Sequence, residues 1–97
     1  VAAESAKQVL FEGGEVASSY QDGIYIGAGT VPEDITVRGV WCYSNGTGGT
    51  YAGIYAALGK RHTITRNRLG GVSESFQDNG VKVDGTSCTD VEVSYNH

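Results

Sequence analysis

The chain repeats a short pattern every 26 to 30 residues, and this period restricts the folds open to it. A first column of alternating segments, each led by glycine, contains residues 23–26, 53–56 and 80–83. A second column, in step with the first, contains residues 9–11, 35–37, 62–64 and 91–93. The 97 residues therefore hold three turns and part of a fourth.

The repeated segments alternate apolar and polar residues, which is the pattern of strands with one inward face. No stretch shows apolar residues at the helical spacing of three and four, and glycine supplies 15 of the 97 residues, so breaks are frequent. Equivalent strands in turns of this length stack in parallel as a β-solenoid. We expect almost no helix, and Val37, Ile64 and Val93 should share one inward column.

Two asparagines recur at one corner of the predicted coil. Asn67 and Asn96 lie three residues after the inward residue of the second column, where Gly14 and Val40 stand in earlier turns. An asparagine there can turn the chain and bond the backbone of the adjacent turn. The sequence therefore predicts an asparagine ladder.

Residues 23–40, 53–69 and 80–97 each resemble one turn of the right-handed parallel β-helix of the pectate lyase-like superfamily. That superfamily includes polygalacturonases, polysaccharide lyases, alginate epimerases and phage tailspikes. The resemblance implies an all-β coil of three to four turns, a polysaccharide partner, and an extracellular or virion-associated location. It implies a glycan-recognising segment of a polysaccharide hydrolase or lyase, without a cofactor unless a lyase uses calcium. The alternative is a non-catalytic spacer in a fibre or adhesin.

We expect residues 1–97 to be a single segment of a longer β-helix, uncapped at both ends. Unpaired strand edges associate readily, and natural solenoids cover them. Flanking segments or partner subunits would cover these edges, and the tailspike resemblance implies a trimer.

Charge and cysteine content exclude several classes of function. The net charge of -4 is a poor match to nucleic acid or to an anionic membrane surface. The two cysteines and two histidines lack the close spacing of a zinc motif. Cys42, in a core column with Val16 and Leu69, lies almost two turns from Cys88, or about 9 Å away, which predicts two free thiols.

The outer face of the first column is the candidate binding surface, because the resemblance places the glycan groove there. Alternation sends Tyr25, Tyr55 and Lys82 outward, one above another. The rings could hold sugars and the ammonium group a carboxylate, or the tyrosines could simply pair across strands. Asp84 is expected beside Lys82 on the same floor, either as part of the binding surface or as a solvated ion pair with Lys82. A groove wall is expected from three loop residues, Tyr51, Glu74 and Phe76, with the alternative that Phe76 folds back to cover the core.

Asp22 and Asp78 are the candidate catalytic pair. They lie two turns apart, or about 9.6 Å, near the upper end of the carboxylate separation of about 6.5 to 9.5 Å in inverting glycosidases. The alternative is that both cap turns. Residues 20–24 resemble a polygalacturonase segment, but the aspartate pair and the histidine of that family are absent from the following turns, so its triad does not carry over.

Basic residues concentrate at 60–62, with Arg66 and Arg68 beyond. A lyase needs a cation beside the uronate carboxylate, and this cluster is the only concentration of positive charge. It is expected on another face than the tyrosines, either in a cleft between subunits or as a solvated exterior. His62 shares a column with inward Ile35 and Val91, which favours a buried, hydrogen-bonded histidine over a general base.

Overall fold

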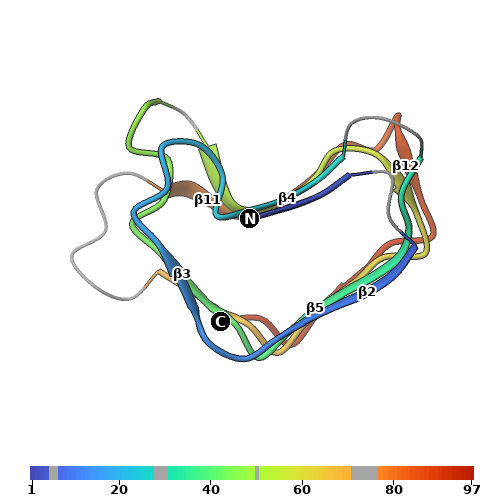
Figure 1. The fold of residues 1–97 in the computed structure, drawn as a ribbon, viewed down its shortest axis with the longest axis horizontal. Coiled ribbons are helices and arrows are strands. Elements are labelled where there is room, and N and C mark those ends of the chain that lie inside the picture. Colours follow the sequence, from blue (N-terminus) through green and yellow to red (C-terminus); the bar gives the residue numbers. More distant parts are fainter. Residues whose placement is uncertain (5–6, 28–30, 50, 71–76) are drawn as a thin grey trace.

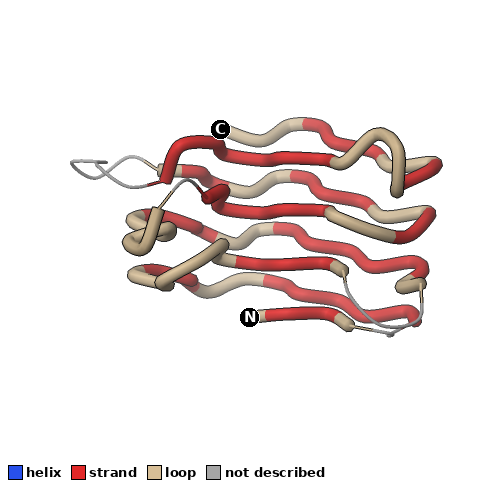
Figure 2. The backbone as a smooth tube through the Cα atoms, turned by 90° about the horizontal axis from the view of Figure 1, so that it is seen from above, coloured by secondary structure: helices blue, strands red, loops and turns tan. Residues whose placement is uncertain are grey.

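The structure is a computed structural model that describes residues 1–4, 7–27, 31–49, 51–70 and 77–97, with the backbone alone at 77–79. The chain coils into stacked turns with the two termini in the first and last turns (Figure 1, Figure 2). In Figure 1 the chain runs clockwise as it moves away from the viewer, so the coil is right-handed. The described residues contain no helix, as the sequence predicts.

Three sheets form the sides of the coil, and every strand pairing is parallel. The first sheet, in spatial order, contains β1 (Ala2–Ala3), β4 (Ile24–Ile26), β7 (Tyr51–Ala56) and β11 (Gln77–Val83). The second contains β2 (Lys7–Glu12), β5 (Glu33–Arg38), β8 (Gly59–Lys60), β9 (Thr63–Thr65), β12 (Cys88–Thr89) and β13 (Glu92–Ser94). The third contains β3 (Glu15–Ala17), β6 (Trp41–Tyr43) and β10 (Arg68–Leu69).

The inward columns stack in the predicted register. Phe11 pairs with Val37, Val37 with Ile64, and Ile64 with Val93. Val37 and Ile64 are fully buried, whereas Val93, in the last turn, is 44% exposed. The apolar core runs through the coil and contains Ala3, Ile24, Ile26, Ile35, Val37, Val40, Cys42, Ile54, Ala56, Ile64 and Cys88.

The corners are built from residues with positive φ that stack in columns. One column contains Gln8, Asp34, Arg61 and Asp90, with φ between 55° and 58°. Another contains Gly13, Gly39, Arg66 and Tyr95, with φ between 54° and 72°. Because a left-handed residue redirects the chain within one step, each column marks a bend shared by successive turns.

The asparagine ladder is present and connects three turns. The Asn67 side chain accepts a hydrogen bond from the Val40 amide at 3.0 Å and donates to the Val37 carbonyl at 3.0 Å. The Asn96 side chain accepts from the Asn67 amide at 3.0 Å and donates to the Ile64 carbonyl at 3.0 Å. Asn67 is fully buried, so these bonds satisfy backbone groups that water cannot reach.

A second buried asparagine, Asn45, ties the third sheet to the loop that returns to the first. Its side chain accepts from the Ser19 amide at 3.2 Å and donates to the Val16 carbonyl at 3.0 Å. Gly23 lies so close that a Cβ there would be 2.5 Å from the Gly53 carbonyl oxygen and 2.7 Å from the Asn45 amide nitrogen. This crowding explains why a glycine precedes β4.

Both cysteines are buried thiols that form no disulfide, as predicted. Cys42 stacks between Val16 and Leu69, and burial raises the pKa of its thiol to about 11. Cys88 donates from Sγ to the Ala56 carbonyl at 3.3 Å. Both thiols therefore act as core groups, since only the thiolate is a strong nucleophile.

We expect Asn67→Ala to lower the free energy of unfolding by about 2 to 5 kcal/mol, because it leaves the Val40 amide and the Val37 carbonyl buried without partners. Asn96→Ala is the matched control and should cost less, since Asn96 is partly exposed and water can replace its amide. Urea unfolding of both variants measures the difference. Equal losses would mean that the ladder does not depend on burial.

Candidate functional site

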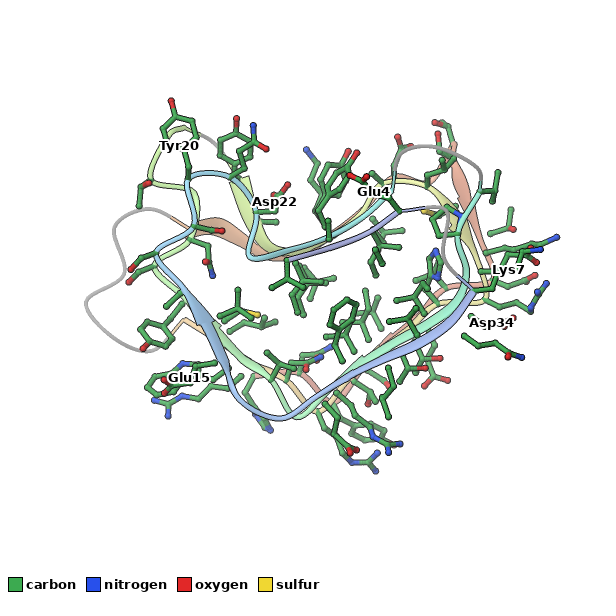
Figure 3. All side chains as sticks on the ribbon, in the orientation of Figure 1. Glu4, Lys7, Glu15, Tyr20, Asp22 and Asp34 are labelled. Carbon is green, nitrogen blue, oxygen red and sulfur yellow. The ribbon has the colours of Figure 1, made fainter. Side chains whose placement is uncertain are left out.

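A groove of about 810 Å³ lies on the outer face of the first sheet. It brings together the predicted residues Asp22, Tyr25, Tyr51, Tyr55 and Lys82. The sequence did not single out its other side-chain contributors, which include Glu4, Ser19, Tyr20 and Gln21. Figure 3 shows the labelled side chains of Glu4, Tyr20 and Asp22 on this outer side of the coil.

Stacked aromatic and basic side chains form the floor of the groove. Tyr25 pairs with Tyr55 in the strand register, and Tyr55 pairs with Lys82, which confirms the predicted column. The two rings meet edge to face, with centroids 5.7 Å apart and planes at 74°. The Lys82 ammonium nitrogen lies 5.0 Å from the centroid of the Tyr55 ring, within the range of a cation–π contact. Along the coil axis, the floor therefore changes from the rings of Tyr25 and Tyr55 to the ammonium group of Lys82.

Three of the groove tyrosines lie against glycines. A Cβ added to Gly48 would be 2.4 Å from the Tyr20 ring, and one added to Gly27 would be 2.9 Å from the Tyr25 ring. One added to Gly49 would be 3.4 Å from Tyr51. The Gly48 amide also donates to the Tyr20 carbonyl at 2.9 Å, which fixes the loop of residues 46–49 beside Tyr20. Gly48 and Gly49 therefore leave room for the rings of Tyr20 and Tyr51.

Asp22 is positioned at the groove by a backbone contact. Its Oδ1 accepts a hydrogen bond from the Ala52 amide at 2.8 Å, which is the turn-capping role considered as the alternative to catalysis. Asp78 lies in β11 at a register shift between Gln77 and Asn79, and its side chain is outside the described part of the chain. The pairing of these carboxylates therefore remains a prediction.

Of the remaining predicted groove residues, Asp84 is described and does not line the groove. Asp84 follows β11, and its Oδ1 accepts from the Thr86 amide at 3.0 Å and from the Thr86 hydroxyl at 2.8 Å. These bonds lower the pKa of the Asp84 carboxyl and place it in a turn beyond the floor. Glu74 and Phe76 fall outside the described residues.

The basic cluster lies on another face and is largely paired. The Arg61 guanidinium donates to Asp34 at 2.9 and 3.1 Å and to Glu33 at 2.7 Å. Lys7 and Lys60 contact the same Glu33 carboxylate at 3.3 and 3.5 Å. We call these five residues the corner ion network. Its pairing supports the solvated exterior expected as one alternative.

The other members of the basic cluster have separate environments. The Arg68 guanidinium carbon lies 4.1 Å from the centroid of the Trp41 ring, and that of Arg66 lies 5.4 Å from the centroid of Tyr95. His62 is 1% exposed, which agrees with the expectation of a buried histidine. Its Nδ1 accepts from the Ile35 amide at 3.3 Å, and its Nε2 lies 3.0 Å from the Leu58 carbonyl, so Nε2 carries the proton.

Comparison with protein-family models, curated proteins and solved structures found no match to this chain. Within the described ranges, no helix is long and apolar enough to span a membrane. The same ranges contain no group of three or more histidine, cysteine, aspartate or glutamate residues placed to hold a metal ion. The assignment of a function therefore depends on the groove.

Glu33→Gln should destabilise the protein near neutral pH, because it removes the carboxylate that Arg61, Lys7 and Lys60 share. Hydrogen bonds from Arg61 and then Lys7 lower the pKa of Glu33 from 4.5 to about 2. A lowered pKa in the folded state gives a stabilisation that is full above pH 4.5 and disappears as the pH falls through about 2.

Urea unfolding across this pH range should therefore show the variant and the parent protein converging in acid. Salt at about 1 M should also reduce their difference, since the basic partners of Glu33 are exposed to solvent. A difference that is independent of both pH and salt would contradict an electrostatic origin.

Gly48→Ala should displace the Tyr20 ring, because the new methyl group would overlap it. Nuclear Overhauser contacts between the Tyr20 ring and residue 48 should disappear, with little change in the melting temperature. Gly85→Ala is the control, since a Cβ there meets nothing within 4 Å. Retention of the ring contacts in Gly48→Ala would show that the position of the Tyr20 ring does not depend on its contact with Gly48.

Proposed function

We propose that this chain is a turn-forming segment of a pectate lyase-like β-helix, and that its first-sheet groove binds a polysaccharide. The observation that carries the proposal is the stacked floor of Tyr25, Tyr55 and Lys82, with Tyr20 and Tyr51 also lining the groove. Its volume of about 810 Å³ falls within the range of about 300 to 1,000 Å³ that is common for ligand pockets.

The groove offers the two kinds of contact that a sugar requires. Aromatic rings pack against the apolar faces of pyranose rings, and polar groups at the rim form hydrogen bonds with the hydroxyl groups. The rim contains Ser19, Gln21 and Asp22, which can donate to or accept from hydroxyl groups. Tyr20 is 69% exposed, so most of its ring is open to a ligand.

The charges give the groove a direction along the coil axis. Glu4 follows β1 in the first turn, and Lys82 lies in β11 in the last turn of the first sheet. A carboxylate on the sugar would be attracted to Lys82 and repelled by Glu4 and Asp22. A uronate-containing chain is therefore the best match, with its acidic group beside Lys82.

The second candidate function is glycan cleavage, with Asp22 and Asp78 as acid and base. It is favoured by the location of Asp22 at the groove, while the Asp22 bond to the Ala52 amide supports the capping role instead. Asp22→Asn separates the two, because the amide oxygen can still accept from Ala52. Loss of cleavage with unchanged binding would support catalysis.

The Tyr25→Ser, Tyr55→Ser double variant tests the binding proposal. We expect binding of a uronate oligosaccharide to weaken by about 1 to 3 kcal/mol, or about 5- to 150-fold, because two aromatic contacts are lost. Calorimetric titration measures the affinity, and a melting curve shows that the fold is retained.

Tyr95→Ser is the matched control, since Tyr95 is 73% exposed and lies outside the groove. It should bind the oligosaccharide like the parent protein. Equal affinity in the double variant, or no binding by the parent protein, would overturn the proposal and favour a structural spacer.

A further inference from the structure

A second hollow, of about 420 Å³, lies at the corner between the second and third sheets. It is lined by Glu12, Gly13, Arg38, Gly39 and Arg66. Figure 1 shows this corner, where β2 and β5 turn toward β3, on the opposite side of the coil from β4 and the first sheet. The hollow is therefore separate from the tyrosine groove.

The shape of the hollow follows from the stacked corner column. In this column the first two turns have Gly13 and Gly39, whereas the next two have Arg66 and Tyr95. A Cβ at Gly13 would meet nothing within 4 Å, and one at Gly39 would meet only the Gly13 nitrogen, at 3.8 Å. The glycines thus leave open space beside the Arg66 side chain.

The described lining of this space contains two guanidinium groups and one carboxylate. Arg38 donates from Nε to Glu12 Oε2. Among the described residues, the only side-chain partner of the Arg66 guanidinium is the Tyr95 ring. The hollow therefore has a local charge of one positive unit, in a chain whose net charge is -4.

The arginine side chains are the available donors in the hollow. The Gly13 and Gly39 amides are already bonded to the carbonyls of Arg38 and Arg66, at 3.1 Å in both cases. Guanidinium groups offer paired N–H donors that match the oxygens of carboxylate, sulfate and phosphate groups. A single oxyanion between Arg38 and Arg66 would balance the local charge.

We infer that this corner hollow is an anion-binding site that accepts one sulfate, phosphate or carboxylate group between Arg38 and Arg66. The site is independent of the proposed glycan groove. Glu12 acts as an internal competitor, because its carboxylate occupies part of the Arg38 donor set. The affinity of the site is therefore set by the balance between Glu12 and the incoming anion.

Titration with inorganic sulfate at constant ionic strength tests the site, with the Gly13 and Gly39 amide signals in nuclear magnetic resonance spectra as the readout. We expect saturable shifts in the parent protein and at least about a fivefold weaker affinity in Arg66→Ala, which loses a charged donor. Arg68→Ala is the control, because it removes the same charge from a residue that stacks on Trp41 outside the hollow. The affinity of this variant for sulfate should be unchanged.

Glu12→Gln provides a test in the opposite direction. It removes the competing charge while leaving both arginines, so the affinity for sulfate should rise. Equal weakening in Arg66→Ala and Arg68→Ala would overturn the site in favour of general surface charge. Absence of any gain in Glu12→Gln would also overturn it.

A second titration, with glucuronate, tests whether the site binds carboxylates as well as sulfate. Saturable shifts at Gly13 and Gly39 with both ligands would support a site for carboxylates as well as sulfate. Shifts with sulfate alone would support a site for tetrahedral anions. Shifts with neither ligand would overturn the inference, whatever the tyrosine groove binds.

Discussion

The buried amide of Asn67 is the interaction on which the regular stacking of the coil depends. It bonds backbone groups of the turn below and the Asn96 side chain of the turn above, so three turns are held in one register. A corner without such a group would leave buried amides and carbonyls unpaired, which costs more than the bonds themselves contribute. Because the corner is fixed, the register of the strands on either side is fixed, and so are the columns of outward side chains on those strands.

The tyrosine groove is a consequence of that register. Tyr25, Tyr55 and Lys82 come together only because their strands align residue by residue across three turns. A shift of one residue would turn each of these side chains into the core and bring isoleucines to the surface. The binding surface and the core are therefore set by the same alternation, and neither can change register without the other.

The sequence predicted those parts of the fold that depend on local alternation and on a fixed period. It identified the column of Val37, Ile64 and Val93, the ladder, and the two free thiols. It missed Asn45 and the contact between Tyr20 and Gly48, because the loops that hold them vary in length from turn to turn.

One signal for the position of Asn45 was present. Ser18 and Ser44 are 26 residues apart, close to the repeat, and both adopt positive φ. Aligning them would have placed Asn45 beside Ser19 at a third corner. The ring of Tyr20 could not have been placed in this way, because its position depends on the path of residues 46–49 around it.

The corner columns also have a cost. Asp34, Arg61 and Arg66 hold a left-handed backbone that glycine would adopt freely, and such a conformation costs a residue with a side chain about 1 kcal/mol or more. At these bends the side chains contact the next turn, because Arg61 donates to Asp34 and Arg66 lies over the Tyr95 ring. Backbone strain and the contacts that tie successive turns together therefore lie at the same positions of the coil.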